Sequence, residues 1–278
     1  MSITQLLLPA FVASLILTGI HAYLGVHVVE RGVIFVDLSL AQIAALGTTV
    51  AYLMGNDLHS PTAYFYSLGF TFLGAAVFAL SRVHHKTRIP QEAVIGIVYA
   101  VSAGIAILVM SKATQETEHL KEMLVGNILS VTWPELLKTA VLYSLVGLFH
   151  FVFRERFLLV SLDGAEAERR GWNIRFWDFL FYVSFGFVVT SSVAIAGVLL
   201  VFCFLIVPSV TAMLFSERLG PRLAIGWSMG ALVSAGGVAL SYELDLPTGA
   251  TIVGTFGLTL LLVAALRWAF WRPRPSVA

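Results

Sequence analysis

The chain has 278 residues, of which 58% are hydrophobic and only 12% charged, and its mean hydropathy is +0.89. This leaves too little polar surface to coat a water-soluble globule of that size, so the composition indicates a membrane protein. Crossings of ~20 residues each use up most of the chain, which excludes a separate catalytic or nucleotide-binding domain. The net charge of +1 offers no broad basic surface for nucleic acid.

The apolar runs between charge clusters predict an all-α bundle of about nine membrane spans, with eight or ten as alternatives. We expect residues 1–278 to form a single transmembrane domain. The stretch 123–133 is about half a bilayer long and ends before Pro134, so it is typical of a re-entrant or interfacial segment. The predicted spans are 6–28, 33–54, 62–81, 92–111, 135–153, 176–194, 197–215, 223–242 and 248–267.

Basic residues gather in alternate loops. One face receives 14 of the 17 Lys and Arg residues, which identifies it as cytoplasmic by the positive-inside rule. The N-terminus is then outside and the C-terminal tail inside. Pro208, within an apolar run, predicts a discontinuous helix near a transport pathway. The basic positions assigned to the cytoplasmic face are Arg31, Arg82, Lys86, Arg88, Arg154, Arg156, Arg169, Arg170, Arg175, Arg218, Arg222, Arg267, Arg272 and Arg274.

A cytoplasmic loop at about 155–175 has the sequence signals of a short, charged helix. Asp163 is a good N-cap, Glu166 can complete a capping box, and Gly171 can end the helix in the left-handed conformation. Such a helix either merely joins two spans or is a docking element through which a soluble partner acts on the bundle.

Several short motifs occur in a fixed order over nearly the whole chain and resemble one family of membrane proteins. Together they are similar to the permease subunit of zinc- and manganese-type metal-uptake ABC transporters. The motifs are Arg31-Gly32, Glu92-Ala-Val-Ile-Gly96, Gly126-Asn-Ile-Leu129, Leu162-Asp-Gly-Ala-Glu-Ala167 with Gly171, and Gly197-Val-Leu-Leu-Val201 followed by Leu205-Ile-Val-Pro208-Ser-Val-Thr-Ala212.

The resemblance implies a homodimeric permease in a prokaryotic cytoplasmic (inner) membrane, with two cytoplasmic ATPase subunits and an extracytoplasmic metal-binding protein. It implies a transported divalent ion, zinc or manganese, and no tightly bound cofactor. This chain has no G-x-x-x-x-G-K-[ST] phosphate loop, so we expect a transport subunit and not an enzyme. In the family the helix matching 163–171 sits in a groove of the ATPase. The resemblance therefore implies that the residues that couple this chain to the ATPase are Asp163, Glu166, Arg169, Arg170 and Gly171.

The second span departs from the family at the expected ion site. The family pattern is Gly-Asp-x-x-Ser-His, whereas a gap-free register from Gly32 to Gly47 puts Leu38 at the Asp position and Gln42 at the His position. Asp37 falls one residue early, rotated by about 100° around the helix. Either the helix start is adjusted to turn Asp37 inward, or the ion site has been rebuilt.

A rebuilt site would draw on the first span. If the first two spans form an antiparallel hairpin, His21 lies level with Gln42, and His27 lies level with Asp37. We hypothesise that His21 replaces the missing imidazole and that Asp37, with or without His27, forms a second level. His21 and His27 are about 240° apart on a straight helix, so one of them is structural. The predicted metal residues are therefore Asp37, His21, His27 and Gln42.

An acidic cluster on the outer side, Glu116, Glu118, His119 and Glu122, is predicted to admit the ion or to dock the outer binding protein. Solvated loop residues are the alternative. The rival function is a proton-coupled secondary transporter of a cation or small solute, in which intramembrane carboxylates and histidines couple a proton gradient to movement.

Overall fold

The computed structural model describes residues 3–57, 60–82, 89–111 and 128–270, and these residues are helical throughout apart from turns and connections. Eight of the helices are long and apolar enough to cross a membrane. The prediction of an all-α membrane bundle is therefore confirmed. The helices are α1 (Ile3–Glu30), α2 (Val36–Leu53), α3 (Pro61–Ser81), α4 (Gln91–Met110), η1 (Ile128–Ser130), α6 (Trp133–Val152), α7 (Arg154–Leu162), α8 (Gly164–Arg169), α9 (Ile174–Met213), α10 (Leu219–Glu243) and α11 (Thr248–Phe270).

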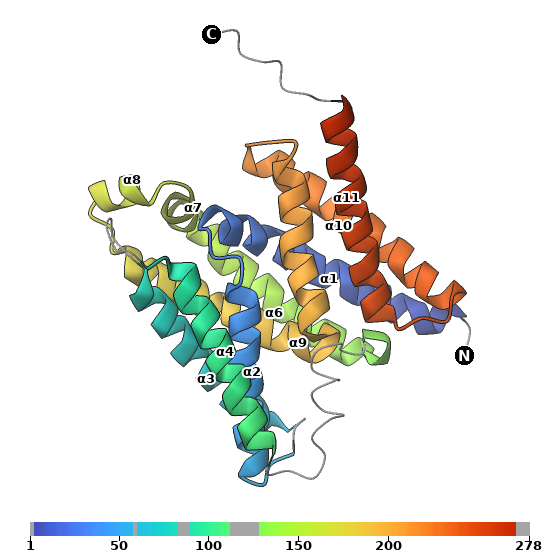
Figure 1. Ribbon diagram of the computed structural model, residues 1–278, viewed down its shortest axis with the longest axis horizontal. Helices are drawn as coiled ribbons and strands as arrows, with labels where there is room; N and C mark the ends of the chain where they lie inside the picture. The colour runs from blue at the N-terminus through green and yellow to red at the C-terminus, as the bar shows by residue number, and fades with distance from the viewer. Residues whose placement is uncertain (1–2, 58–59, 83–88, 112–127, 271–278) are drawn as a thin grey trace.

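The longest helix, α9, is broken at Gly197. This residue has φ 75° and ψ 162°, outside the helical range, and the two halves of α9 point in different directions (Figure 1). The break separates the two predicted spans 176–194 and 197–215. The prediction of a discontinuity at Pro208 is wrong, since the second half is helical through that residue. Proline fits a helical φ, whereas only glycine adopts a positive φ without strain.

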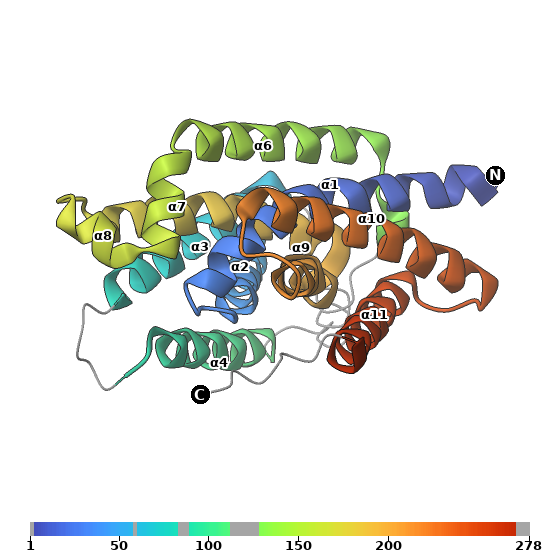
Figure 2. The ribbon, with the colours of Figure 1, turned by 90° about the horizontal axis from the view of Figure 1, so that it is seen from above.

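The helices form two groups joined by α9. Helices α2, α3 and α4 pack together, while α1 packs against α9 and α10, and α11 packs against α10 and the second half of α9. Seen from above, α6 lies on one side of the bundle and α4 on the opposite side (Figure 2). The short helices α7 and α8 lie together at one end in both views (Figures 1 and 2).

Helix α1 is held close to its neighbours by two small residues. A Cβ atom on Gly25 would lie 2.0 Å from the backbone oxygen of Leu205, and one on Gly230 of α10 would lie 2.1 Å from Cγ2 of Thr18. Such close approach is typical of helix seams in membranes. Helix α1 therefore packs along α9 and α10 and diverges from α2 after the turn at Arg31 (Figure 1). The antiparallel hairpin expected from the sequence does not form.

Candidate functional site

The buried face of α1 carries His21, which is fully enclosed. Its Nδ1 lies 2.7 Å from the carbonyl oxygen of Leu17, and its Nε2 lies 3.2 Å from the Ser192 hydroxyl of α9. Because a carbonyl only accepts, Nδ1 carries the proton and Nε2 keeps the lone pair. His21 therefore has the tautomer that a metal ligand needs, but a serine hydroxyl of α9 occupies the position facing Nε2.

His27 lies six residues further along α1 and is 1% exposed. Its Nδ1 bonds the Ser161 hydroxyl at 2.8 Å, whereas its buried Nε2 has no hydrogen-bond partner among the described residues. Tyr23 packs edge-on against its ring and reaches Nδ1 of His150 at 3.3 Å. This end of α1 thus sits in a mixed aromatic and imidazole cluster contributed by α1, α6, α7 and α9.

Asp37, in the first turn of α2, is 1% exposed. Neither of its carboxylate oxygens has a hydrogen-bond partner in the described part of the chain. The neighbouring Leu38 is only partly buried, so the helix turns Asp37 inward, as one of the two sequence alternatives required. A buried carboxylate without a partner is costly, and in a membrane protein it is typical of an ion or proton pathway.

The four predicted metal residues do not meet at one point. Gln42 is partly buried and lies five residues after Asp37, about 140° around α2, so the two side chains leave different faces of the helix. The ring of Tyr143, on α6, lies 6.2 Å from that of His21 between centroids, and among these described residues neither ring is hydrogen-bonded to the Asp37 carboxylate. No group of three His, Cys, Asp or Glu side chains within the described ranges is arranged to hold a metal ion.

The predicted coupling loop folds as two helices, α7 and α8. The Asp163 carboxylate accepts a hydrogen bond from the Glu166 backbone N–H at 2.9 Å, and Gly171 has φ 73°, so the predicted N-cap and left-handed end are confirmed. The reciprocal half of the capping box is wrong, because Glu166 accepts hydrogen bonds from Arg170 and Arg169 instead. These bonds hold the pKa of Glu166 below its usual range.

A buried ionic cluster joins the turn after α1 to α3 and α9, and sequence reasoning missed it. Asp178 of α9 is fully buried and pairs with Arg31 at 2.6 Å and with Arg82 at 2.5 Å. The sequence signal was an acidic residue in an apolar run, but the pairing joins residues more than 90 positions apart.

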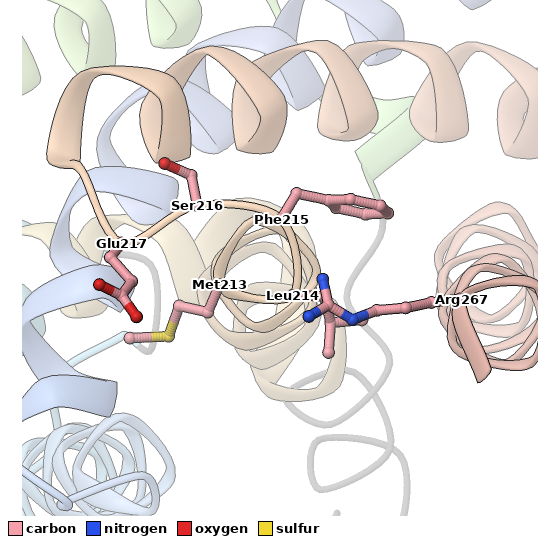
Figure 3. A pocket seen from close by; sticks show the side chains of 6 residues that line it. All are labelled: Met213, Leu214, Phe215, Ser216, Glu217 and Arg267. Carbon is pink, nitrogen blue, oxygen red and sulfur yellow. The ribbon is translucent and has the colours of Figure 1, made fainter. Parts of the chain in front are cut away.

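A partly buried ion pair, Glu30 with Arg222, joins the end of α1 to the start of α10. Nearby, a pocket of about 230 Å³ lies between the end of α9 and α11 (Figure 3). Arg267 reaches toward the pocket from α11, with its guanidinium 5.7 Å from the ring centre of Phe215. Glu217 carries the opposite charge at the other side of the pocket (Figure 3), so its walls favour no single sign of ligand charge.

The acidic cluster Glu116, Glu118, His119 and Glu122 lies outside the described residues. Its predicted role therefore stays a prediction.

A bundle of apolar spans, buried ionisable side chains and a short charged helix at one end define a polytopic transport protein. The sequence matches the ABC 3 transport family over residues 3–267, which is nearly the whole chain. The chain therefore belongs to this family, and it is a multi-pass prokaryotic membrane protein. This membership favours the permease over the proton-coupled transporter that the sequence left open.

Relatives within the family are named for metal transport. The chain is 28% identical over 244 residues to the manganese transport system membrane protein MntC of Listeria innocua, covering 88% of this chain and 84% of the relative. It is equally identical to a probable iron transport system membrane protein of Haemophilus influenzae, covering 88% and 87%. Both names describe membrane proteins of metal transport systems.

Two solved structures share the fold. PsaBC from Streptococcus pneumoniae, in complex with Fab, superposes with a TM-score of 0.76 at 22% identity, over 92% of this chain and 90% of that one. An inward-facing conformation of a putative metal-chelate type ABC transporter gives a TM-score of 0.71 at 20% identity, over 93% and 85%.

Proposed function

We propose that this chain is the membrane-spanning permease subunit of an ABC importer for a divalent transition metal, with manganese as the first candidate. The observation that carries the proposal is Asp37, a buried carboxylate without a hydrogen-bond partner among the described residues, in a family whose relatives are named for manganese and iron transport. Carboxylate and amide oxygens suit Mn²⁺ better than they suit zinc, which favours nitrogen and sulfur ligands.

ATP is hydrolysed by separate cytoplasmic ATPase subunits that grip α8, and an extracytoplasmic metal-binding protein delivers the ion. The family resemblance and the exposed charges of Arg169 and Arg170 on α8 support this arrangement. Two permease chains form a homodimer in the cytoplasmic membrane. The chain works as one transmembrane domain, with the coupling loop at about 155–175.

The N-terminus lies outside and nine spans cross the bilayer, because α9 supplies two of them. At ~1.5 Å per residue its 40 residues measure ~60 Å, about twice the ~30 Å thickness of a hydrocarbon core. Gly197, where α9 turns, divides the helix into two crossing segments. The basic loops then fall on the cytoplasmic side, in agreement with the positive-inside rule.

Asp37 is the primary metal contact in this proposal. His21, whose Nε2 keeps its lone pair, joins it when α9 moves and withdraws the Ser192 hydroxyl. His27, with its unpartnered Nε2, and Gln42 line the same route at other levels. The outer residues Glu116, Glu118, His119 and Glu122 attract the ion or dock its binding protein.

The test is metal-dependent uptake in metal-depleted cells that carry the permease with its ATPase subunit. Separate Asp37→Ala and His21→Ala variants should abolish uptake of added Mn²⁺ while still co-purifying with the ATPase. Ser39→Ala is the control, because it removes another buried polar group from the first turns of α2, two residues after Asp37. Normal uptake in both variants would remove the proposed site, and a chain that brings down no ATPase would remove the proposed function.

A further inference from the structure

Asp178 ties three helices together through its two arginines. Arg31 follows α1, Arg82 ends α3, and Asp178 lies in the first turns of α9. The side chain of Asp178 is 0% exposed and that of Arg31 is 2% exposed, so the contact lies away from water. Charges buried this way hold each other firmly, because separating them leaves one of them without compensation.

The same two arginines also bind the helix that leads into α8. Nε of Arg31 donates to the Ser161 hydroxyl at 2.8 Å, and Nη2 of Arg82 donates to the carbonyl of Val160 at 3.0 Å. Ser161 and Val160 lie in the last turn of α7, two and three residues before the Asp163 N-cap of α8. A Cβ on Gly164 would lie 3.1 Å from Nη2 of Arg82, so this guanidinium also lies against the start of α8.

Ser161 extends this connection into the bundle. Its hydroxyl bonds Nδ1 of His27 at 2.8 Å as well as Nε of Arg31. His27 lies on α1, the helix that also carries His21. The Ser161 hydroxyl therefore links α7 directly to α1, and a movement of α7 would be transmitted to α1 through this hydrogen bond. Within the described residues, Nη2 of Arg31 and Nε2 of His27 have no hydrogen-bond partner. Spare donor and acceptor capacity allows such a network to exchange partners between two arrangements.

We propose that Arg31, Arg82, Asp178 and Ser161 form a clasp that transmits the movement of α8 to α1, α3 and α9, so that they are positioning residues for transport. This inference rests on the proposed function, since it needs an ATPase that moves α8. The clasp fixes α7 and α8 to the spanning helices, so that all of them move together when the ATPase moves α8. Without the clasp, α8 moves while the spanning helices stay in place. ATP hydrolysis then continues without transport.

The experiment compares coupling ratios in proteoliposomes that contain the complex of permease and ATPase subunit, measured as Mn²⁺ transported per ATP hydrolysed. Ser161→Ala removes the link between α7 and α1 but leaves both ion pairs of Asp178 in place. Ser184→Ala is the matched control, because it deletes a buried hydroxyl bonded to His150 without touching α7 or an arginine. Asp178→Asn serves as a second variant of the clasp.

We expect Ser161→Ala to hydrolyse ATP but to transport about tenfold less Mn²⁺ per ATP, the factor for one lost hydrogen bond to a charged group. Asp178→Asn should lower the ratio at least as far, and Ser184→Ala should match the wild type. Because the ratio is measured only on assembled complexes that hydrolyse ATP, misfolded protein does not change it.

If both clasp variants transport as much Mn²⁺ per ATP as the wild type, the clasp is wrong but the proposed function stands. The same holds if Ser184→Ala lowers this ratio as much as the clasp variants do. A wild-type complex that hydrolyses ATP but moves no Mn²⁺ would overturn the proposed function, and the clasp with it.

Discussion

Two carboxylates are buried in this bundle to the same degree, and their surroundings are opposite. Asp178 is fully enclosed and paired with two arginines, whereas Asp37 is 1% exposed and has no hydrogen-bond partner among the described residues. A buried charge that is already neutralised has no need of a mobile ion. A buried carboxylate with free oxygens gains most from a cation. The comparison separates a residue that holds helices together from one that we propose binds the transported ion.

The largest effect should come from removing the partnered carboxylate. Asp178→Ala leaves the buried guanidinium of Arg31 without its carboxylate partner, and the partly exposed Arg82 loses the same partner, so the change should cost about 3–5 kcal/mol of unfolding free energy. The measurement is the unfolding midpoint of the purified protein in detergent at a fixed heating rate. Asp37→Ala, measured alongside, should cost far less because its carboxylate has no hydrogen-bond partner to lose within the described ranges. Equal losses in the two variants would erase the distinction between the carboxylates.

Replacing the whole cluster should reverse most of that loss. The triple variant Arg31→Met, Arg82→Met and Asp178→Leu removes all three charges together, and buried ion clusters replaced by apolar side chains are often neutral in stability. Its unfolding midpoint should therefore lie well above that of Asp178→Ala. Transport should stay uncoupled, because α7 has lost its hydrogen bonds to Arg31 and Arg82 and keeps, among the hydrogen bonds described, only the one between Ser161 and His27. A triple variant as unstable as the single one would show that the charges are not the cause.

Asp37→Asn should affect transport and not stability. The amide keeps the shape of the side chain and removes a buried charge without a partner, so the unfolding midpoint should not fall. Uptake of Mn²⁺ should fall at least about tenfold. Substituting residues that only hydrogen-bond to a metal ligand already lowers metal affinity or activity by about 10–100-fold, and Asp37 is proposed to contact the metal itself. Ser39→Ala, on the same helix, should leave both quantities near the wild type. A lower midpoint in Asp37→Asn would mean that the carboxylate is structural.

The smallest effect concerns the exposed carboxylate of α8. Hydrogen bonds from Arg170 and Arg169 lower the pKa of Glu166, so its stabilising contribution is present above the unfolded value of about 4.3 and is lost as the pH falls through the lower folded value. Glu166→Gln should therefore unfold slightly earlier than the wild type at pH 7. The difference should vanish in acid below the lowered pKa. A difference that persists there would exclude the carboxylate as its source.

The sequence predicted the spans well because lipid requires long apolar runs. The predicted and observed bounds of α3, 62–81 and Pro61–Ser81, agree closely, and the break in α9 at Gly197 falls where the sequence predicted the boundary between 176–194 and 197–215. The cap at Asp163 and the left-handed Gly171 were predictable because they depend on local backbone geometry. These features are encoded within a few residues of each other.

Long-range pairing was not predictable from the same signals. The hairpin of the first two spans failed because α1 meets Leu205 and Gly230, whose close approach depends on helices far along the chain. The partners of Asp178 are 147 and 96 residues away, and nothing in one sequence identifies them. Asp37 was recognised as a candidate from a family motif, but its inward orientation required the structure.

The most direct test of the account is accumulation of radioactive Mn²⁺ by cells that carry the permease and its ATPase subunit, at equal amounts of protein in the membrane. The wild type should accumulate the ion, Asp37→Asn should remain at the background of cells without the permease, and Ser39→Ala should follow the wild type. Accumulation by Asp37→Asn at the wild-type rate would contradict the claim that this unpartnered carboxylate receives the metal.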